Sequence, residues 1–328
     1  MTAANADLER IGAIVRESSS LREIYRNTAP EDIPARLRRS ARGRELLTQI
    51  DAHLDAYGFR ELSIITVGLP PLKDVPWVVH GTLTALARRE ERGEPSANDR
   101  LERARSLVAS QHGLRARLLR RPLARLYTSA RAATALREDS YYLIVTVIAV
   151  VRRMILELGR RLAERGVLRN PDDIVYLELD EWDATSADRL RSLVERRKAA
   201  RGSALDHYTA VPAELLERAG GSEHVQGTPA SRGTFVGLVR VVNDESEFAA
   251  LADGEVLVCP YTNPTWTPLF AVAGAVVVDS GGMASHAAIV AREHGIPAIM
   301  GTRNGTRVLT TGQRVLVDAD RGVVVPIG

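Results

Sequence analysis

The residues best suited to chemistry lie between 276 and 302, where a histidine follows a glycine-rich turn. This stretch reads VVVDSGGMASHAAIVAREHGIPAIMGT. Its pattern predicts a buried strand over 276–278, a tight turn over 279–282 and a helix over 285–294. His286 is therefore expected on the first turn of a helix, directly after the glycines.

That position gives the imidazole of His286 two useful properties. The positive end of the helix dipole disfavours the imidazolium form, so a ring nitrogen stays available as a nucleophile. The backbone N–H groups of the turn and first helical residues, at Gly281, Gly282 and Ser285, can hold an anion delivered to that nitrogen. A histidine that accepts a phosphoryl group needs both properties.

Other readings of this region are weaker. Ser285 and His286 are adjacent on one helix, so their side chains diverge, and no G-x-S-x-G motif is present, which argues against a hydrolase. The lone cysteine, Cys259, excludes an internal disulfide and is expected to be buried rather than reactive. The remaining histidines show no metal-ligand spacing, so no metal site is predicted: 53, 80, 112, 207, 224 and 294.

Several neighbouring residues are candidates for the same site. Arg292, two turns along the helix, could pair with phosphate or with a partner, or form a solvent-exposed salt bridge. Thr262, Trp266 and Thr267 belong to a proline-rich loop that could reach the histidine or could simply pack. Asp279 is expected to cap the turn.

The elements around this site change character along the chain. The first part predicts helices over 7–27, 31–57, 74–90, 97–118, 121–136, 138–165, 187–200 and 211–219, with a short strand at 172–179. The last part predicts strands over 235–242, 254–259, 274–278, 298–300, 313–318 and 322–326, with helices at 245–251 and 285–294.

This order predicts an α+β chain with two domains. An all-α helical domain over 1–219 is followed by a linker rich in Gly, Ser and Pro over 220–233 and a β/β/α domain over 234–328. Hydrophobic residues make up 45% and charged residues 26% of the 328, and the net charge is +3, which excludes a disordered chain and gives no case for nucleic acid. The start has no targeting signal, so a cytoplasmic protein is expected.

The run around His286 resembles the phosphohistidine signature of the phosphoenolpyruvate-utilising enzymes. The resemblance continues through GTPASRGTFVGLVRVV, PYTNPTWTPLF and GQRVLVDADRGVV, in the same order. It implies that the last domain is the swivelling domain of that family and that His286 is phosphorylated, at Nε2. One position departs: relatives usually have threonine at Ala284, whose hydroxyl helps orient the imidazole, and Ser285 could take over.

The helical part resembles the acceptor-binding domain of rifampin phosphotransferase-type proteins over 55–64, 135–168 and 171–182. By this resemblance Arg137 helps hold the transferring phosphoryl group, whereas Tyr141 stands where those relatives have lysine. Tyr141, Tyr142 and Trp77 could line an aromatic acceptor pocket, or pack in the core. The general base stays open among Glu138, Asp139 and His207.

The sequence has no module that would bind ATP or handle pyruvate. The chain has no G-x-x-x-x-G-K-[ST] loop and no room for a nucleotide-grasp domain or a (β/α)₈ barrel. ATP and Mg²⁺ are therefore expected on a separate ATP-grasp-type partner protein that phosphorylates His286, this chain being a complete subunit. Lys73 and Lys198 are the only lysines among 44 basic residues, so phosphate handling should rest on arginine.

The expected function is that of the phosphohistidine-bearing subunit of a dikinase-like phosphotransferase. ATP would yield AMP and phosphate, and His286 would pass a phosphoryl group to an acceptor hydroxyl. A phenol or alkylphenol is the preferred acceptor, as in the phenylphosphate synthases of aromatic compound degradation. The alternatives are a component of a rifampin-like antibiotic phosphotransferase and a non-catalytic phosphocarrier or regulatory protein.

Overall fold

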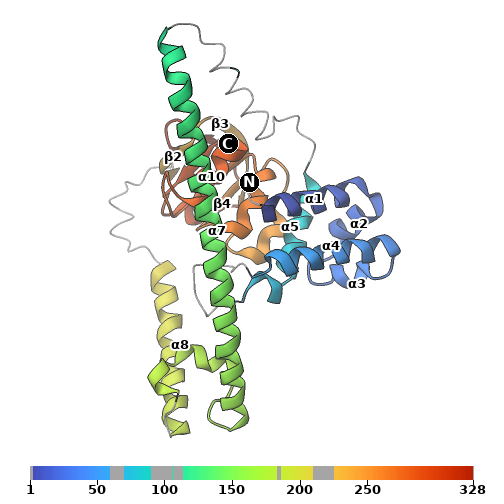
Figure 1. Cartoon of the computed structure of the whole chain (residues 1–328), viewed down its shortest axis with the longest axis vertical. Coiled ribbons are helices and arrows are strands. Elements are labelled where there is room, and N and C mark those ends of the chain that lie inside the picture. Colours follow the sequence, from blue (N-terminus) through green and yellow to red (C-terminus); the bar gives the residue numbers. More distant parts are fainter. Residues whose placement is uncertain are drawn as a thin grey trace. The chain divides into compact units, whose positions relative to one another are not determined.

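The computed structural model describes residues 3–59, 70–89, 106, 114–182, 186–209 and 225–327. These residues group into two compact units. The first draws on 1–60, 72–143 and 223–328, and the second on 61–71 and 144–222. N-terminal helices and a C-terminal mixed sheet confirm the predicted α+β class (Figure 1).

The N-terminal helices of the first unit begin at short polar caps. They are α1 (Ala3–Glu17), α2 (Ser19–Asn27), α3 (Ile33–Leu37), α4 (Ala41–Tyr57), the 3₁₀ helix η1 (Leu72–Asp74) and α5 (Trp77–Arg88). The predicted helix over 7–27 is two helices because Ser18 has extended backbone and its side chain accepts a hydrogen bond from the Leu21 N–H. The predicted helix over 31–57 likewise divides at Ser40, which caps α4.

Helix α5 is the centre of this helical group. Every residue from Val78 to Ala87 is buried, and α1 and α2 pack against it. A polar pair lies inside this core, where the Tyr25 hydroxyl meets Nδ1 of His80 at 3.1 Å. A second histidine, His53, is buried on α4 and meets Asp7 Oδ2 at 2.8 Å.

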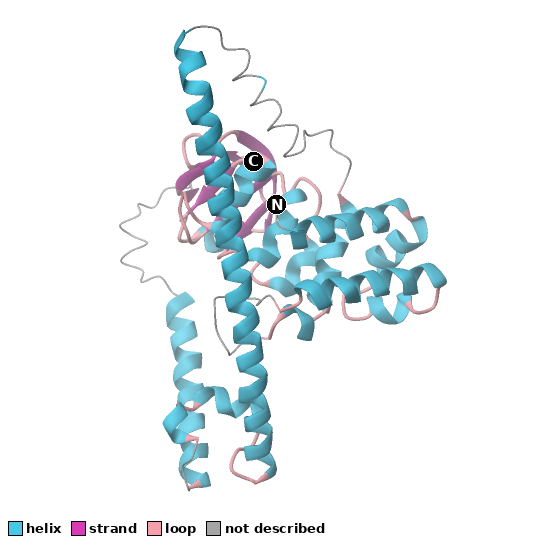
Figure 2. Cartoon of the chain, viewed as in Figure 1, coloured by secondary structure: helices cyan, strands magenta, loops and turns pink. Residues whose placement is uncertain are grey.

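The C-terminal part of the first unit is an eight-stranded sheet (magenta in Figure 2). Its strands are β1 (Val225–Gln226), β2 (Thr228–Ser231), β3 (Thr234–Val241), β4 (Val256–Cys259), β5 (Ala275–Val278), β6 (Ala298–Met300), β7 (Arg314–Asp318) and β8 (Val323–Pro326). They lie in the order β1-β8-β7-β3-β4-β5-β6-β2. The central strands β3, β4, β5 and β6 are parallel, and the outer pairings are antiparallel.

The two edge strands of this sheet follow one another along the chain, separated by Gly227. The sheet must therefore curl until its edges approach. A side chain at Gly227 would collide there, because a Cβ would lie 2.6 Å from the Met300 carbonyl oxygen. Curling buries strands such as β4 and β5 on both faces, which is why they are continuous runs of apolar residues.

Short helices connect the strands. They are the 3₁₀ helices η4 (Glu245–Ala250) and η5 (Pro264–Ala271) and the α-helices α10 (His286–His294) and α11 (Gly305–Val308). Helix α10 packs on β2, β6 and η5. Helices η4 and η5 pack against α5, where Arg88 Nη1 donates to the Ala249 carbonyl at 2.5 Å. The helical group and the sheet thus share one packed unit.

The second unit is a helical hairpin. Helix α7 (Leu114–Glu164) enters it beyond residue 143, the 3₁₀ helices η2 (Pro171–Tyr176) and η3 (Leu179–Glu181) form its turn, and α8 (Ala187–Thr209) returns. Its core gathers apolar side chains from all parts: Leu162, Leu168, Ile174, Leu177, Leu190 and Val194. Arg197 of α8 bonds Glu181 at 2.6 Å, and Lys198 bonds Asp173 at 2.6 Å.

Two secondary-structure predictions are wrong in this region. The strand predicted over 172–179 is η2 and η3, because Asn170 caps η2 in a capping box with Asp173 and Pro171 supplies a helical start. The helices predicted over 121–136 and 138–165 are one helix, α7, which continues through Pro122.

Some predictions fall on residues outside the described part. These are most of the helix over 97–118, the helix over 211–219 and residues 220–224 of the linker. The rest of the predicted linker contains β1 and β2, which pair with β8 and β6. The predicted domain boundaries stay a prediction.

Two kinds of feature are absent from the described residues. None of their helices is both long and apolar enough to cross a membrane. Among the same residues, no group of three or more His, Cys, Asp or Glu side chains could hold a metal ion.

The buried histidine of α5 makes stability depend on pH. Burial lowers the pKa of His80 to about 4, whereas in the unfolded chain it is about 6.5. The fold therefore accommodates the neutral ring. Because the folded protein binds a proton at His80 less tightly than the unfolded chain does, this residue lowers the free energy of unfolding as pH falls from about 6.5 toward 4, by about 3 kcal/mol in all. Above about pH 6.5 it lowers it by nothing.

Urea unfolding between pH 7 and pH 4 tests this. The variant His80→Gln keeps a hydrogen-bonding partner for Tyr25 without a titrating group, so its free energy of unfolding should fall less steeply over this range. Equal slopes for the two proteins would contradict the assignment.

Candidate functional site

His286 is the first residue of α10 and is half-buried. The helix begins there because Ser285 has extended backbone and its Oγ accepts a hydrogen bond from the Ala288 N–H at 3.3 Å. It ends at Gly295, whose φ of 69° is the left-handed cap that glycine favours. The predicted helix start and stop are confirmed, and the imidazole lies at the N-terminal end.

The glycines before the helix shape the turn that carries it. Gly281 has a φ of 84°, and a Cβ there would lie 3.0 Å from the Ser285 Cβ. The Gly282 carbonyl accepts a hydrogen bond from the Ser285 N–H at 2.9 Å. Gly282 faces open space, since a Cβ there would meet no atom beyond its chain neighbours within 4 Å. The turn therefore passes close to the helix start without covering it.

A threonine from a different element meets the imidazole. Oγ1 of Thr267, on η5, lies 3.0 Å from Nε2 of His286. Thr267 is 3% exposed, so this hydroxyl is almost completely withdrawn from solvent. The structure thus brings together two residues of the predicted site that are 19 positions apart in the sequence.

A buried carboxylate fixes the helix that carries Thr267. Oε1 of Glu245 accepts hydrogen bonds from Asn263 Nδ2 at 3.0 Å and from Trp266 Nε1 at 3.1 Å. Asn263 in turn caps η5 by accepting from the Thr265 N–H at 2.8 Å. Burial raises the pKa of Glu245, which is 7% exposed. Trp266 is therefore a fully buried anchor of η5, and its neighbour Thr267 is the residue that contacts the histidine.

Asp279 ties the strand before the glycine turn to the next loop. Its Oδ1 accepts from Thr302 Oγ1 at 2.7 Å and from the Gly305 N–H at 2.5 Å, and its Oδ2 accepts from Thr306 Oγ1 at 2.5 Å. Gly305 and Thr306 begin α11, so Asp279 caps that helix. The expected cap of its own turn is wrong, because all hydrogen bonds of this carboxylate go to residues 302–306. The carboxylate holds the end of β5 in place.

Arg292 holds the other side of the turn. Its Nε donates to the Ala230 carbonyl of β2 at 2.7 Å, and its Nη2 donates to the Met283 carbonyl at 2.7 Å. The guanidinium therefore clamps the glycine-rich segment to the edge of the sheet. Pairing of Arg292 with phosphate stays a prediction.

The other residues near the turn take varied positions. Ser285 Oγ caps α10, so the hydroxyl that the structure places at the imidazole is that of Thr267. Ala284 is exposed, and Thr262 is half-buried between β4 and η5. Cys259 is buried in β4, and this burial raises the pKa of its thiol well above the ordinary value, which confirms the expected inert cysteine.

The predicted acceptor residues are described only in part. Trp77 is the first residue of α5 and is half-buried. The backbones of the remaining candidates lie in α7 or α8, and their side chains are outside the described part of the chain: Arg137, Glu138, Asp139, Tyr141, Tyr142 and His207.

Sequence reasoning missed two of the supporting residues. Asn263 precedes Pro264, and this order of a capping residue and a proline at the first helical position could have indicated the start of η5. Glu245 gives no such signal, because nothing in the sequence distinguishes it from its acidic neighbours Asp244 and Glu247, which are less buried. Its role follows from burial alone.

Comparison with known families matches both parts of the chain. Residues 251–322 match the family described as PEP-utilising enzyme, mobile domain. Residues 1–138 match the family described as rifampicin phosphotransferase fourth domain. The first match contains His286, the glycine turn and η5.

Relatives that align with most of this chain agree with these matches. The chain is 28% identical over 95% of its length to the uncharacterized phosphotransferase YvkC of Bacillus subtilis, covering 40% of that protein. It is 33% identical over 86% of its length to a rifampicin phosphotransferase of a Streptomyces species, covering 35% of that protein. It is 28% identical over 96% of its length to the rifampicin phosphotransferase of Streptomyces sviceus, covering 38% of it. The chain thus spans less than half of these relatives.

The contact between Thr267 and His286 predicts a spectroscopic effect. The variant Thr267→Val keeps the side-chain shape but loses the hydroxyl, so the ¹⁵N shift of His286 Nε2 should move. The lost hydrogen bond should also lower the free energy of unfolding by about 1 kcal/mol.

The matched variant Thr267→Ser keeps a hydroxyl and should retain the wild-type shift. NMR of ¹⁵N-histidine-labelled protein makes the comparison. An unchanged Nε2 shift in the valine variant would show that the hydroxyl does not engage this nitrogen.

Proposed function

Because the chain carries the mobile domain of the phosphoenolpyruvate-utilising enzymes and a rifampicin phosphotransferase fourth domain, we propose that it is the phosphohistidine-bearing part of a phosphotransferase, with His286 as the phosphorylated residue. The observation that supports this most directly is the position of His286. It begins α10 directly after a glycine turn, and its Nε2 faces a buried threonine hydroxyl.

The proposed reaction has two transfers. In the first, Nε2 of His286 forms a bond to the β-phosphorus of ATP as the oxygen of AMP leaves, and water then attacks the γ-phosphorus, so that phosphate leaves and phosphohistidine remains. In the second, the acceptor hydroxyl oxygen forms a bond to that phosphorus, the N–P bond breaks, and the hydroxyl proton passes to a base. Overall, ATP, water and the acceptor give AMP, phosphate and the phosphorylated acceptor.

Residues of this chain would act by positioning and by charge stabilisation, which dominate phosphoryl transfer. With Nδ1 protonated, the Thr267 hydroxyl donates to the Nε2 lone pair and orients the ring. An incoming phosphoryl group would replace that hydroxyl at Nε2. The N-terminal end of α10 then presents N–H donors and a favourable dipole to the bound phosphoryl group.

We propose that a partner protein of ATP-grasp type binds ATP and Mg²⁺ and phosphorylates His286. The sequence has no nucleotide-binding loop of the G-x-x-x-x-G-K-[ST] type, and the relatives it matches are more than twice as long. The phosphohistidine domain would turn to reach the acceptor. Since residues 225–231 lie in β1 and β2 of the sheet, the turning point of the predicted 220–233 linker would precede Val225.

Two acceptor classes fit this proposal. A phenol or alkylphenol is favoured by Tyr141, Tyr142 and Trp77 in the predicted acceptor region. A rifamycin-type antibiotic is the second candidate, supported by the fourth-domain match over 1–138. Arg137 is proposed to hold the phosphoryl group during transfer to either acceptor.

The first test is labelling of His286. With the partner, Mg²⁺ and ATP labelled at its β- and γ-phosphates, the wild-type chain should acquire acid-labile label, and His286→Ala should acquire none. The control His294→Ala changes the histidine at the other end of the same helix and should label normally. Full labelling of His286→Ala would refute the proposal.

The second test separates the two transfers. Arg137→Ala should reduce transfer from phosphohistidine to a phenol or rifamycin roughly a hundredfold, because a guanidinium that stabilises transition-state charge is lost. Labelling of His286 should stay near the wild-type level. Arg125→Ala, elsewhere on α7, is the matched control and should affect neither step. Loss of both steps in Arg137→Ala would mean a structural role for this arginine.

A further inference from the structure

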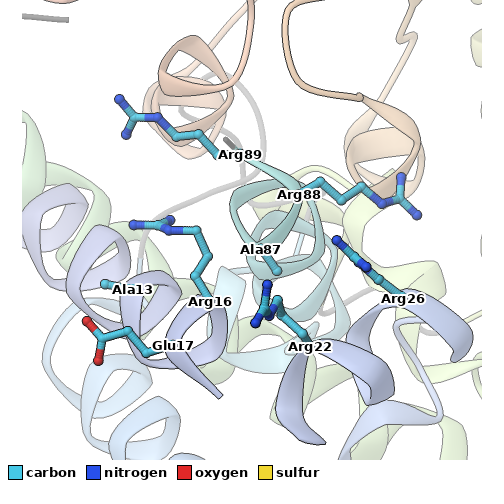
Figure 3. A pocket seen from close by; sticks show the side chains of 8 residues that line it. All are labelled: Ala13, Arg16, Glu17, Arg22, Arg26, Ala87, Arg88 and Arg89. Carbon is cyan, nitrogen blue, oxygen red and sulfur yellow. The ribbon is translucent and has the colours of Figure 1, made fainter. Parts of the chain in front are cut away.

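A pocket of about 560 Å³ lies among α1, α2 and the end of α5, within the first unit (Figure 3). Its described lining residues include none from the proposed phosphoryl-transfer site. Its lining is dominated by one residue type: Ala13, Arg16, Glu17, Arg22, Arg26, Ala87, Arg88 and Arg89.

The charge of this pocket is strongly unbalanced. Among the described lining residues are five arginines and one carboxylate, that of Glu17, which Figure 3 shows directed away from Arg22 and Arg26. Arginine does not lose its proton in proteins, so the repulsion cannot be relieved by deprotonation. All five are half-buried except Arg26, which weakens screening by water. A bound anion is the direct way to offset this charge.

Acidic side chains in the described part of the chain form no ion pair with four of these arginines. Within the described residues, Arg22, Arg26, Arg88 and Arg89 have no carboxylate within the 4.0 Å of an ion pair. Glu9 acts on Arg16 and Arg89 from further away, and burial raises the pKa of this carboxyl despite their charge.

The fold holds the arginines in place. Arg16 Nη1 donates to the Leu86 carbonyl at 3.1 Å, and Arg88 Nη1 donates to the Ala249 carbonyl at 2.5 Å. Arg22 and Arg26 are four residues apart on α2 and so share a face. Figure 3 shows both pointing from α2 toward Ala87 at the end of α5.

We propose that this pocket binds a small ligand with several linked phosphate groups, of the oligophosphate class. Planar guanidinium forks match phosphate or carboxylate oxygens in pairs, and several forks together can bind more oxygens than a single carboxylate offers. The lining residues that the structure describes include no aromatic ring and no apolar side chain larger than alanine, so they offer nothing to stack on a nucleobase or sugar. The volume of the pocket exceeds that of one phosphate group, and its excess of positive charge suits several linked phosphates.

Calorimetric titration of the full chain with tripolyphosphate tests this site. We expect saturable binding of one tripolyphosphate per chain, with orthophosphate binding at least roughly tenfold more weakly because it offers fewer charged hydrogen bonds. The assay needs neither ATP nor a partner protein. A failure here is therefore separate from a failure of the proposed phosphotransfer.

Variants locate the binding. The double variant Arg22→Gln/Arg26→Gln should weaken tripolyphosphate binding at least roughly tenfold, since two charge-assisted contacts are lost. The matched control Arg36→Gln/Arg39→Gln removes two exposed arginines near α3 and should bind as wild type. Arg26→Gln alone, at an exposed position that cannot disturb the core, should weaken binding severalfold and decides the case if the double variant misfolds.

Three results would overturn the proposal. The first is the absence of saturable binding by wild type. The second is equal weakening by the control pair, which would indicate a diffuse surface effect. The third is tighter binding of a hexaglutamate peptide than of tripolyphosphate, which would assign the pocket to an acidic protein segment instead.

Discussion

The hydrogen bonds of one buried carboxylate determine how the candidate site is built. Glu245 joins Asn263 and Trp266, and these residues define the start of η5. A charged or partly charged group costs free energy inside a protein unless its oxygens are bonded, so this arrangement is specific in geometry. Because Thr267 follows Trp266 directly, the same bonds fix where its hydroxyl meets His286.

The same carboxylate lies at the junction between the sheet and the helical group. Glu245 belongs to η4, and both η4 and η5 pack against α5. Arg88 adds a bond to the Ala249 carbonyl at this junction. Under the proposed mechanism, a phosphohistidine domain that travels between partner and acceptor would exchange these contacts for others.

Positive charge around the glycine turn, the junction and the pocket is supplied by arginine side chains. Arg292 bonds two backbone carbonyls around the glycine turn, and Arg88 bonds a third at the junction. Such forked, permanently charged donors can hold a segment of backbone and still present further donors. The described lining of the pocket among α1, α2 and α5 has five arginines and one carboxylate, so under our proposal the residue type that supports the fold elsewhere creates a site for anions there.

Local signals in the sequence determined the α+β class, most strands and the placement of His286. Glycines with left-handed backbone, a serine cap and alternating valines act over a few residues, so their effects can be read without knowing the fold. The prediction of a strand over 172–179 was wrong because it overlooked such a local signal. Its apolar pattern suited a strand, but Asn170 and Pro171 began a helical turn instead.

Only the tertiary structure decided which side chains meet. Thr267 reaches His286 because η5 is anchored by the burial of Glu245 and Trp266, and burial depends on contacts distant in sequence. The arginine pocket likewise joins α1 and α2 to the end of α5, more than 60 residues further along the chain. Periodicity and motifs describe neighbours along the chain, whereas desolvation and charge balance are properties of the packed molecule.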